Sequence, residues 1–172
     1  MEEFEQVEDV NLEQVDIISI EKFIILSLIT FRIYPVWWMY KTWRFFKYKD
    51  GLNIMPAPRA FFSLFFLYGL FERIQDFAYE KGYNQEFSSG GYFIGYIFFS
   101  LLSSAPDPFW IINIVNIFFI IPAVKAFNYG VENSSEYEGI NKDKFTNKQV
   151  ALLLIGGIFT VLVILSFFLP EV

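Results

Sequence analysis

Five apolar segments of helical length dominate the sequence and restrict what the chain can fold into. Val150 to Leu169 contains twenty uncharged residues, enough at 1.5 Å per residue to cross a hydrocarbon layer of about 30 Å. Phe23 to Tyr40 is an 18-residue run with Arg32 as its only charge. Because 55% of the 172 residues are hydrophobic, the core of one small water-soluble domain cannot bury all of their side chains. The sequence therefore predicts membrane-spanning helices.

The three other segments are shorter or partly polar. Ala60 to Phe71 is strongly apolar and then meets Glu72, so we expect a helix that continues into polar last turns. Tyr92 to Leu102 provides about 20 Å of helix even with its flanking residues, which is short for a span. Phe109 to Ala126 follows an Asp-Pro pair, a combination typical of a helix start.

Local signals mark two more helix starts and one close packing site. Ser19 is placed to cap the first apolar segment. Thr146 and Gln149 form a Thr-x-x-Gln capping box directly before the last segment. Within that last segment, Gly156 and Gly157 predict that another helix approaches its backbone closely.

The distribution of Lys and Arg selects the topology, because cations resist translocation across a bilayer. Four spans, with Tyr92 to Leu102 interfacial, place nine cations inside and three outside, whereas five spans place five inside and seven outside. We therefore expect an all-α polytopic transmembrane helical bundle with four spans and one short interfacial or partly inserted helix. The predicted location is the bacterial cytoplasmic (inner) membrane. A re-entrant first segment, broken near Arg32, is the alternative and would leave the N-terminus inside.

The N-terminal end differs in composition from the rest of the chain. Eight of the nineteen acidic residues lie in the first 21 positions. We expect residues 1–19 to form a solvated acidic tail, with a weak amphipathic helix as the alternative, and residues 20–170 to form one transmembrane helical domain.

Aromatic and cationic residues gather at the end of the first long segment. Tryptophan and tyrosine followed by lysine and arginine are typical of a membrane–water interface, where the cations can attract anionic lipid headgroups. The predicted interface anchors are Trp37, Trp38, Tyr40, Lys41, Trp43, Arg44 and Lys47.

Polar side chains within the apolar segments are candidates for an intramembrane site. Arg32 requires a partner or water, and Glu72 and Asp76, one helical turn apart, are the acids that could supply it. Asn113 and Asn116 share a helix face and either line a cavity or hydrogen-bond to a neighbouring helix. The structural alternative has Arg32 reaching an interface and the acids at a solvated helix end.

The composition removes several kinds of chemistry. The chain has no cysteine and no histidine, so it has no thiolate nucleophile, no imidazole base and none of the usual transition-metal ligands. Carboxylates and tyrosines remain as acids or bases. We predict no catalytic residue, no metal and no cofactor. The cations beside the first apolar segment favour a lipid interface over nucleic acid.

Several aromatic-rich motifs lie along the apolar part of the chain. The run from Ile20 contains LSLITF, a tyrosine and WWMYKTW, and it is followed by RAFF, PDPFW and IPAVKAFN. This pattern resembles a family of small, uncharacterised bacterial membrane proteins over most of Ile20 to Pro170. Arg32 stands where that family is expected to have glycine, and the acidic tail is longer. The resemblance implies a helical membrane protein and transfers no catalytic residue.

Three functions remain compatible with the sequence. The first is a non-enzymatic accessory or scaffold subunit that binds membrane lipids and another membrane protein or a second copy of itself. The second is a small transporter, channel or lipid-binding protein that uses the polar site. The third, a membrane enzyme, requires a pocket that gathers carboxylates or a carboxylate and a tyrosine.

Overall fold

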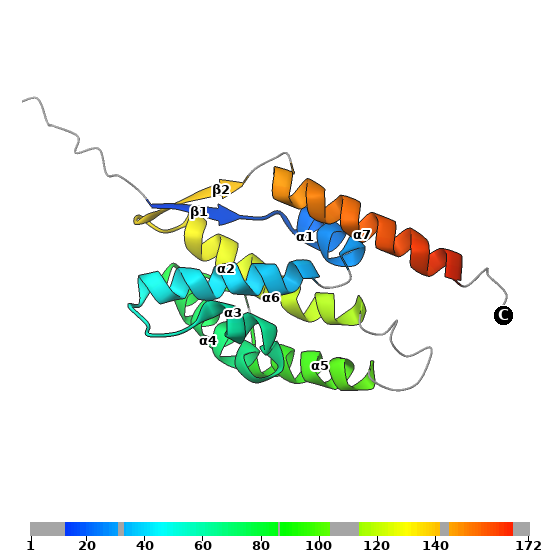
Figure 1. Ribbon diagram of the computed structural model, residues 1–172. Helices are drawn as coiled ribbons and strands as arrows, with labels where there is room; N and C mark the ends of the chain where they lie inside the picture. Colours follow the sequence, from blue (N-terminus) through cyan, green and yellow to red (C-terminus); the bar gives the residue numbers. More distant parts are fainter. Residues whose placement is uncertain (1–12, 31–32, 86, 104–113, 142–144, 167–172) are drawn as a thin grey trace, which may run out of the picture.

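The computed structural model describes residues 13–30, 33–85, 87–103, 114–141 and 145–166. They form a mainly helical fold with one small sheet (Figure 1). The elements in chain order are β1 (Glu13–Ile17), α1 (Ile20–Ile29), α2 (Ile33–Lys49), α3 (Pro56–Phe61), α4 (Ser63–Glu80), α5 (Ser89–Leu102), α6 (Asn116–Glu132), β2 (Tyr137–Asn141) and α7 (Asn147–Ser166).

The helices form two groups with α2 and α6 between them (Figure 1). On one side, α3, α4 and α5 pack together, with α3 and α4 against α2 and with α4 and α5 against α6. On the other side, α1 packs against α2, α6 and α7, and the sheet of β1 and β2 lies against α6. The two ends of the described chain, β1 and α7, therefore lie on the same side of the fold.

The predicted transmembrane bundle is wrong. Within the described residues, no helix combines the length and the apolarity that crossing a bilayer requires. The α1 helix has 10 residues and α5 has 14, against the approximately 20 that a span needs. The α4 helix has 18 residues, but its second half carries acidic and basic side chains. The four spans and the multi-pass location in the bacterial cytoplasmic membrane are therefore not supported.

The first long apolar segment shows why the prediction failed. The sequence predicts one apolar helix from Phe23 to Tyr40, but α1 ends at Ile29 and α2 begins at Ile33. Thr30 connects the two helices, since its hydroxyl donates to the Leu26 carbonyl (2.6 Å) and accepts from the Tyr34 amide (3.0 Å). Pro35 lacks an amide hydrogen, which a helix tolerates in its first turn and not in its interior. Two shorter helices are the consequence.

The part of the acidic N-terminal segment that the structure describes is a strand. Glu13 to Ile17 pair in parallel with Tyr137 to Asn141, with Val15 opposite Gly139. Both a solvated tail and an amphipathic helix were therefore wrong for these five residues. Two short strands more than a hundred residues apart give no local signal of their pairing, so the sheet could not be found from sequence periodicity.

Several predicted helix boundaries are confirmed. Ser19 accepts a hydrogen bond from the Lys22 amide and caps α1 (3.4 Å). The capping box of α7 is reciprocal, since the Gln149 amide donates to Thr146 Oγ1 (3.4 Å) and the Thr146 amide donates to Gln149 Oε1 (2.9 Å). The α4 helix continues past Glu72 to Glu80, as expected.

Aromatic rings make up much of the core where α2, α4 and α6 meet. Phe77 of α4 lies between Phe45 of α2 (centroids 5.4 Å apart) and Phe127 of α6 (6.4 Å). Tyr137 of β2 lies 5.0 Å from Phe45, so the sheet joins the same cluster. Because Gly130 has no side chain, the Phe77 ring can lie against the α6 backbone. The cluster fixes α2, α4, α6 and β2 relative to one another.

Candidate functional site

The predicted intramembrane polar site is not assembled by the described residues. Arg32 and Asn113 lie outside these residues. Glu72 and Asp76 are exposed on α4, whereas Asn116 is completely buried at the start of α6. The Asn116 amide donates to Ser100 Oγ (2.9 Å) and so connects α6 to α5. This geometry corresponds to the structural alternative for Asn116, a hydrogen bond between neighbouring helices.

The polar end of α4 makes surface contacts. A hydrogen bond with the Glu72 carboxylate raises the pKa of the Tyr68 phenol, one turn earlier on the same exposed face. Arg73 pairs with Asp50 (2.9 Å) and attaches α4 to the end of α2. These contacts are typical of a solvated helix end, where ion pairs contribute little stability.

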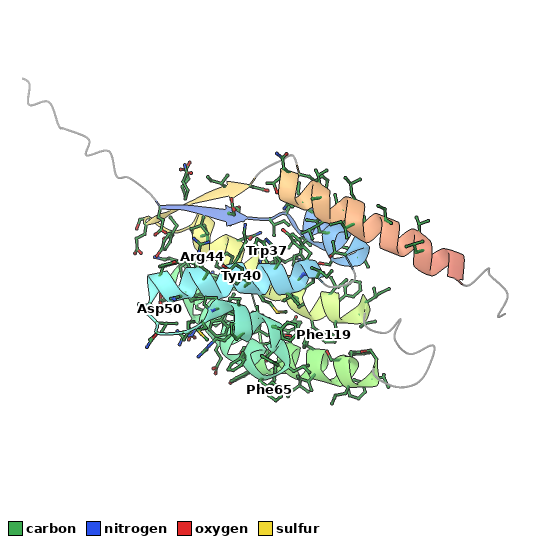
Figure 2. The ribbon with its side chains drawn as sticks, in the orientation of Figure 1. Trp37, Tyr40, Arg44, Asp50, Phe65 and Phe119 are labelled. Carbon is green, nitrogen blue, oxygen red and sulfur yellow. The ribbon has the colours of Figure 1, made fainter. Side chains whose placement is uncertain are left out.

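The predicted interface anchors divide into a buried and an exposed set. Trp38 and Trp43 belong to the core, with the Arg59 guanidinium 4.8 Å from the centre of the Trp43 ring. Trp37 and Arg44 are exposed, and Tyr40, Lys41 and Lys47 are partly buried. Figure 2 shows Trp37, Tyr40 and Arg44 along α2. The anchors therefore do not form one belt.

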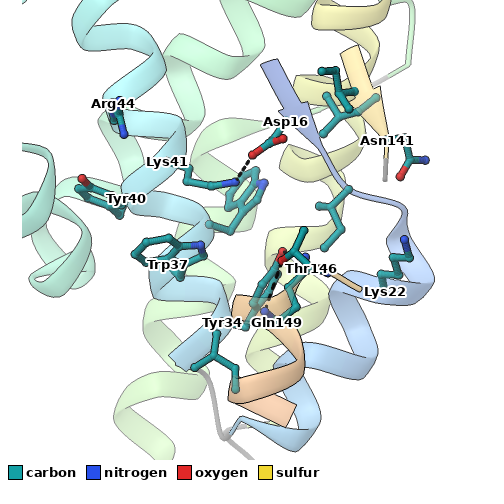
Figure 3. A pocket seen from close by; sticks show the side chains of 15 residues that line it. Asp16, Lys22, Tyr34, Trp37, Tyr40, Lys41, Arg44, Asn141, Thr146 and Gln149 are labelled. Carbon is teal, nitrogen blue, oxygen red and sulfur yellow. Dashed lines mark hydrogen bonds and ion pairs between the residues drawn. The ribbon is translucent and has the colours of Figure 1, made fainter. Parts of the chain in front are cut away.

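A cavity of about 820 Å³ lies beside the exposed anchors, and we call it the polar cavity. It is enclosed by α2, by the ends of β1 and β2, and by the first turns of α1 and α7 (Figure 3). Its lining residues are Asp16, Ile17, Ile18, Lys22, Tyr34, Trp37, Trp38, Tyr40, Lys41, Arg44, Ile140, Asn141, Thr146, Gln149 and Leu152.

The charges that line the polar cavity favour an anion. Lys22, Lys41 and Arg44 face a single carboxylate, that of Asp16, so the lining carries a formal charge of +2 (three minus one). Lys41 pairs with Asp16 (2.7 Å) at a partly exposed position, where solvent screens the attraction. Arg44 contacts the Tyr48 ring (5.7 Å), and no carboxylate among the described residues forms an ion pair with it.

Tyr34 supplies a buried hydrogen-bond donor at the base of the polar cavity. Gln149 Oε1 accepts from the Thr146 amide, which fixes the side-chain amide so that Gln149 Nε2 donates to the Tyr34 hydroxyl (3.2 Å; Figure 3). Tyr34 therefore accepts this bond, and no described residue accepts the hydrogen of its own hydroxyl. The Tyr34 side chain is only 5% exposed, so this uncommitted donor is buried.

The protonation state of Tyr34 suits this role. Burial raises the pKa of Tyr34, the Gln149 hydrogen bond lowers it, and the Asp16 carboxylate raises it further, with a net upward shift. A phenol with a raised pKa stays protonated throughout the neutral range. Its hydrogen is available to an acceptor in the cavity, and an anionic oxygen is the strongest such acceptor.

A second cavity, about 550 Å³ in volume, lies between α2 and α3, and we call it the apolar cavity. Trp37 and Tyr40 line both cavities, so the two spaces share this pair as a wall. The apolar cavity is lined by Ile33, Val36, Trp37, Tyr40, Ala57, Ala60 and Phe61.

Sequence reasoning found the α2 part of the polar cavity and missed the rest. The predicted interface anchors include Trp37, Lys41 and Arg44, whereas Asp16 falls in the predicted tail and Tyr34 is not among the predicted site residues. The capping box identified Thr146 and Gln149 as helix-start residues only. The second function of Gln149, orienting Tyr34, depends on a contact between residues 115 positions apart.

The donor set of the polar cavity suits an anion rather than a cation. Within the described residues, no three Asp or Glu side chains gather closely enough to hold a metal ion. The chain matches no protein-family model, no curated protein and no solved structure. The resemblance to a family of small bacterial membrane proteins therefore stays a prediction.

Proposed function

We propose that this protein is a non-enzymatic binding protein for a small ligand that carries a phosphate or carboxylate group. The observation that supports this function best is the buried, protonated Tyr34 hydroxyl, which is oriented by Gln149 and has no acceptor among the described residues. The hydrogen of this hydroxyl is available to a ligand in the polar cavity, and an anionic oxygen is its strongest acceptor.

The remainder of the cavity supports the same assignment. Lys22 and Arg44 contribute positive charge. Trp37 and Tyr40 each contribute one hydrogen-bond donor, carried by an aromatic ring. A cavity of this size with a few polar groups among apolar side chains is typical of ligand sites of roughly 300–1,000 Å³. The single carboxylate, Asp16, pairs with Lys41.

Tyr34→Phe should weaken binding of ethyl phosphate by about tenfold or more, because a hydrogen bond to a charged group contributes roughly 1.5–3 kcal/mol. Tyr48→Phe is the matched control, since Tyr48 lies on the same helix, is 65% exposed and does not line the polar cavity. Isothermal titration calorimetry measures both variants, and thermal unfolding verifies that each is folded.

The proposal fails if the folded wild-type protein binds neither ethyl phosphate nor a short carboxylate. It also fails if Tyr34→Phe and Tyr48→Phe bind ethyl phosphate as tightly as the wild type does.

A second function, as an accessory subunit of a protein complex, is favoured by the apolar surface of α3, α4 and α5. Phe61 is 75% exposed, Phe65 is 77% exposed and Ile94 is 68% exposed. Figure 2 shows Phe65 at the outer edge of the molecule. Large exposed apolar side chains on adjacent helices are typical of interaction surfaces, since a monomer in water gains nothing from exposing them.

The double variant Phe61→Ser/Phe65→Ser should lose a stoichiometric protein partner that co-purifies with the wild type in mild detergent. Tyr48→Ser, which removes an exposed ring from α2, should retain that partner. Quantitative mass spectrometry of the purified complexes provides the measurement. An unchanged set of partners in the double variant, or a wild-type protein that purifies as a monomer without a partner, contradicts this second function.

A further inference from the structure

We infer that the ligand is an amphiphile whose anionic head occupies the polar cavity and whose alkyl chain lies in the apolar cavity between α2 and α3. This inference rests on the proposed function, because it assigns the anionic group to the site around Tyr34. It adds that the remainder of the ligand is an alkyl chain, and it assigns this chain to the apolar cavity as a second subsite.

The two cavities adjoin at Trp37 and Tyr40, which line both. These residues are three positions apart on α2 and therefore lie on one face of the helix, with ring centroids 5.4 Å apart and planes tilted by 35°. Trp37 is 39% exposed, so its ring lies at the surface between the two spaces rather than within the core. A ligand whose head lies beside Tyr34 can therefore extend across this aromatic pair into the second space.

The lining of the apolar cavity excludes a second polar group. None of its seven lining residues is charged, and its only side-chain heteroatoms are the Trp37 indole nitrogen and the Tyr40 hydroxyl, both in the shared wall. Ala57 and Ala60 are small and leave space opposite Ile33 and Val36. The occupant is therefore apolar.

The apolar cavity is long enough for an alkyl chain of several carbons. The α2 contacts extend from Ile33 to Tyr40, which corresponds to about 10 Å along the helix axis at 1.5 Å per residue. An apolar space of this length that adjoins a cationic cavity accommodates an alkyl chain attached to a phosphate or carboxylate. Fatty acids, alkyl phosphates and acidic phospholipids share this chemistry.

The test compares ethyl phosphate with hexyl phosphate, both well below the concentration at which they aggregate. Each additional buried methylene adds about fourfold in affinity, so partial burial of the longer chain should give hexyl phosphate at least about a tenfold advantage in the wild type. Ala57→Trp should reduce this advantage to less than about threefold and leave ethyl phosphate affinity within about twofold, because a larger side chain occupies the apolar cavity.

The matched control is Ala151→Trp on α7, an exposed alanine that lines neither cavity. It should retain the full preference for hexyl phosphate. If the alkyl chain only adsorbed to exposed apolar surface, both tryptophan variants would keep the preference for hexyl phosphate. A loss of this preference in Ala57→Trp alone therefore excludes general adsorption.

The outcomes separate the inference from the proposed function. If the wild type binds neither phosphate, the proposed function itself fails. If ethyl phosphate binds and hexyl phosphate gains nothing, or if Ala57→Trp keeps the full gain or loses both ligands equally, the anionic site stands and the chain subsite is overturned.

Vesicles distinguish the source of the chain once the subsite is supported. The protein is sedimented with phosphatidylcholine vesicles that contain phosphatidic acid. If the wild type sediments with these vesicles and Ala57→Trp sediments less, the source is a membrane lipid. Binding of hexyl phosphate without sedimentation on these vesicles identifies a free amphiphile instead. Both results support the shared chemistry.

Discussion

Gly156→Leu should lower the free energy of unfolding by about 3 kcal/mol, at the upper end of the cost of overpacking. A Cβ at position 156 would overlap the carbonyl oxygen of Ile29 and lie 3.1 Å from the Cα of Thr30. Both neighbours are backbone atoms of the α1 end, which cannot move aside as a side chain can. The α7 helix would have to separate from α1, and Gln149, near its start, would move away from Tyr34. Ethyl phosphate affinity should therefore fall together with stability.

Gly157→Leu is the matched control for this prediction. A Cβ at position 157 meets nothing within 4 Å, and leucine has a higher helix propensity than glycine by up to about 1 kcal/mol. This variant should be as stable as the wild type or slightly more stable. Urea unfolding followed by circular dichroism measures both variants. Equal stability of the two would show that α1 and α7 do not pack through Gly156.

Phe77→Ala should cost about 3–5 kcal/mol, the range expected when a fully buried phenylalanine is truncated. The Phe77 side chain is only 1% exposed and lies in ring contact with Phe45, Phe46 and Phe127. Its removal would leave a cavity bordered by α2, α4 and α6. Because these rings hold the elements together, the remaining structure cannot fill the space without separating other contacts.

Phe65→Ala, on the same helix, is the control that separates the loss of a buried ring from the loss of an exposed one. Phe65 is 77% exposed, so truncation should change stability by no more than about 0.5 kcal/mol. Thermal or urea unfolding at one pH compares the pair. A Phe65→Ala variant as unstable as Phe77→Ala would contradict the inward orientation of Phe77 on α4.

Helix starts could be predicted from the sequence because their signals are local. Ser19 and the Thr146–Gln149 box lie within four residues of the backbone groups that they satisfy, and both caps are present. Short-range chemistry determines these two caps, so tertiary structure does not change them. Of the two glycines predicted to allow a close helix approach, Gly156 does so at the Ile29 carbonyl, whereas a Cβ at Gly157 would meet nothing within 4 Å.

The transmembrane prediction is wrong because the interruptions in the apolar segments shorten the helices or make them partly polar. Pro35 converts one predicted span into α1 and α2, and the charges after Phe71 belong to the same helix as the apolar run before it. Much of the aromatic content instead packs ring against ring between helices, as Phe45 and Phe127 do (5.1 Å). A high aromatic fraction therefore did not by itself specify bilayer-spanning helices.

The candidate site could be predicted only in part because it is assembled from distant segments. The cationic and aromatic side of α2 was visible as a cluster in the sequence. Asp16 and Gln149 join it through parallel pairing of β1 with β2 and through packing of α7 on α1. Neither contact has a local signal in one sequence, so the cavity emerges only from the fold.

The most direct test of the anionic site is a nuclear magnetic resonance titration of the ¹⁵N-labelled wild-type protein with ethyl phosphate, which observes the indole N–H groups. Trp37 and Trp38 line the polar cavity, whereas Trp43 is 2% exposed and lines neither cavity. We predict saturable shifts of the Trp37 and Trp38 signals and an unchanged Trp43 signal. No saturable shift, or equal shifts of all three signals, would contradict the anionic site around Tyr34.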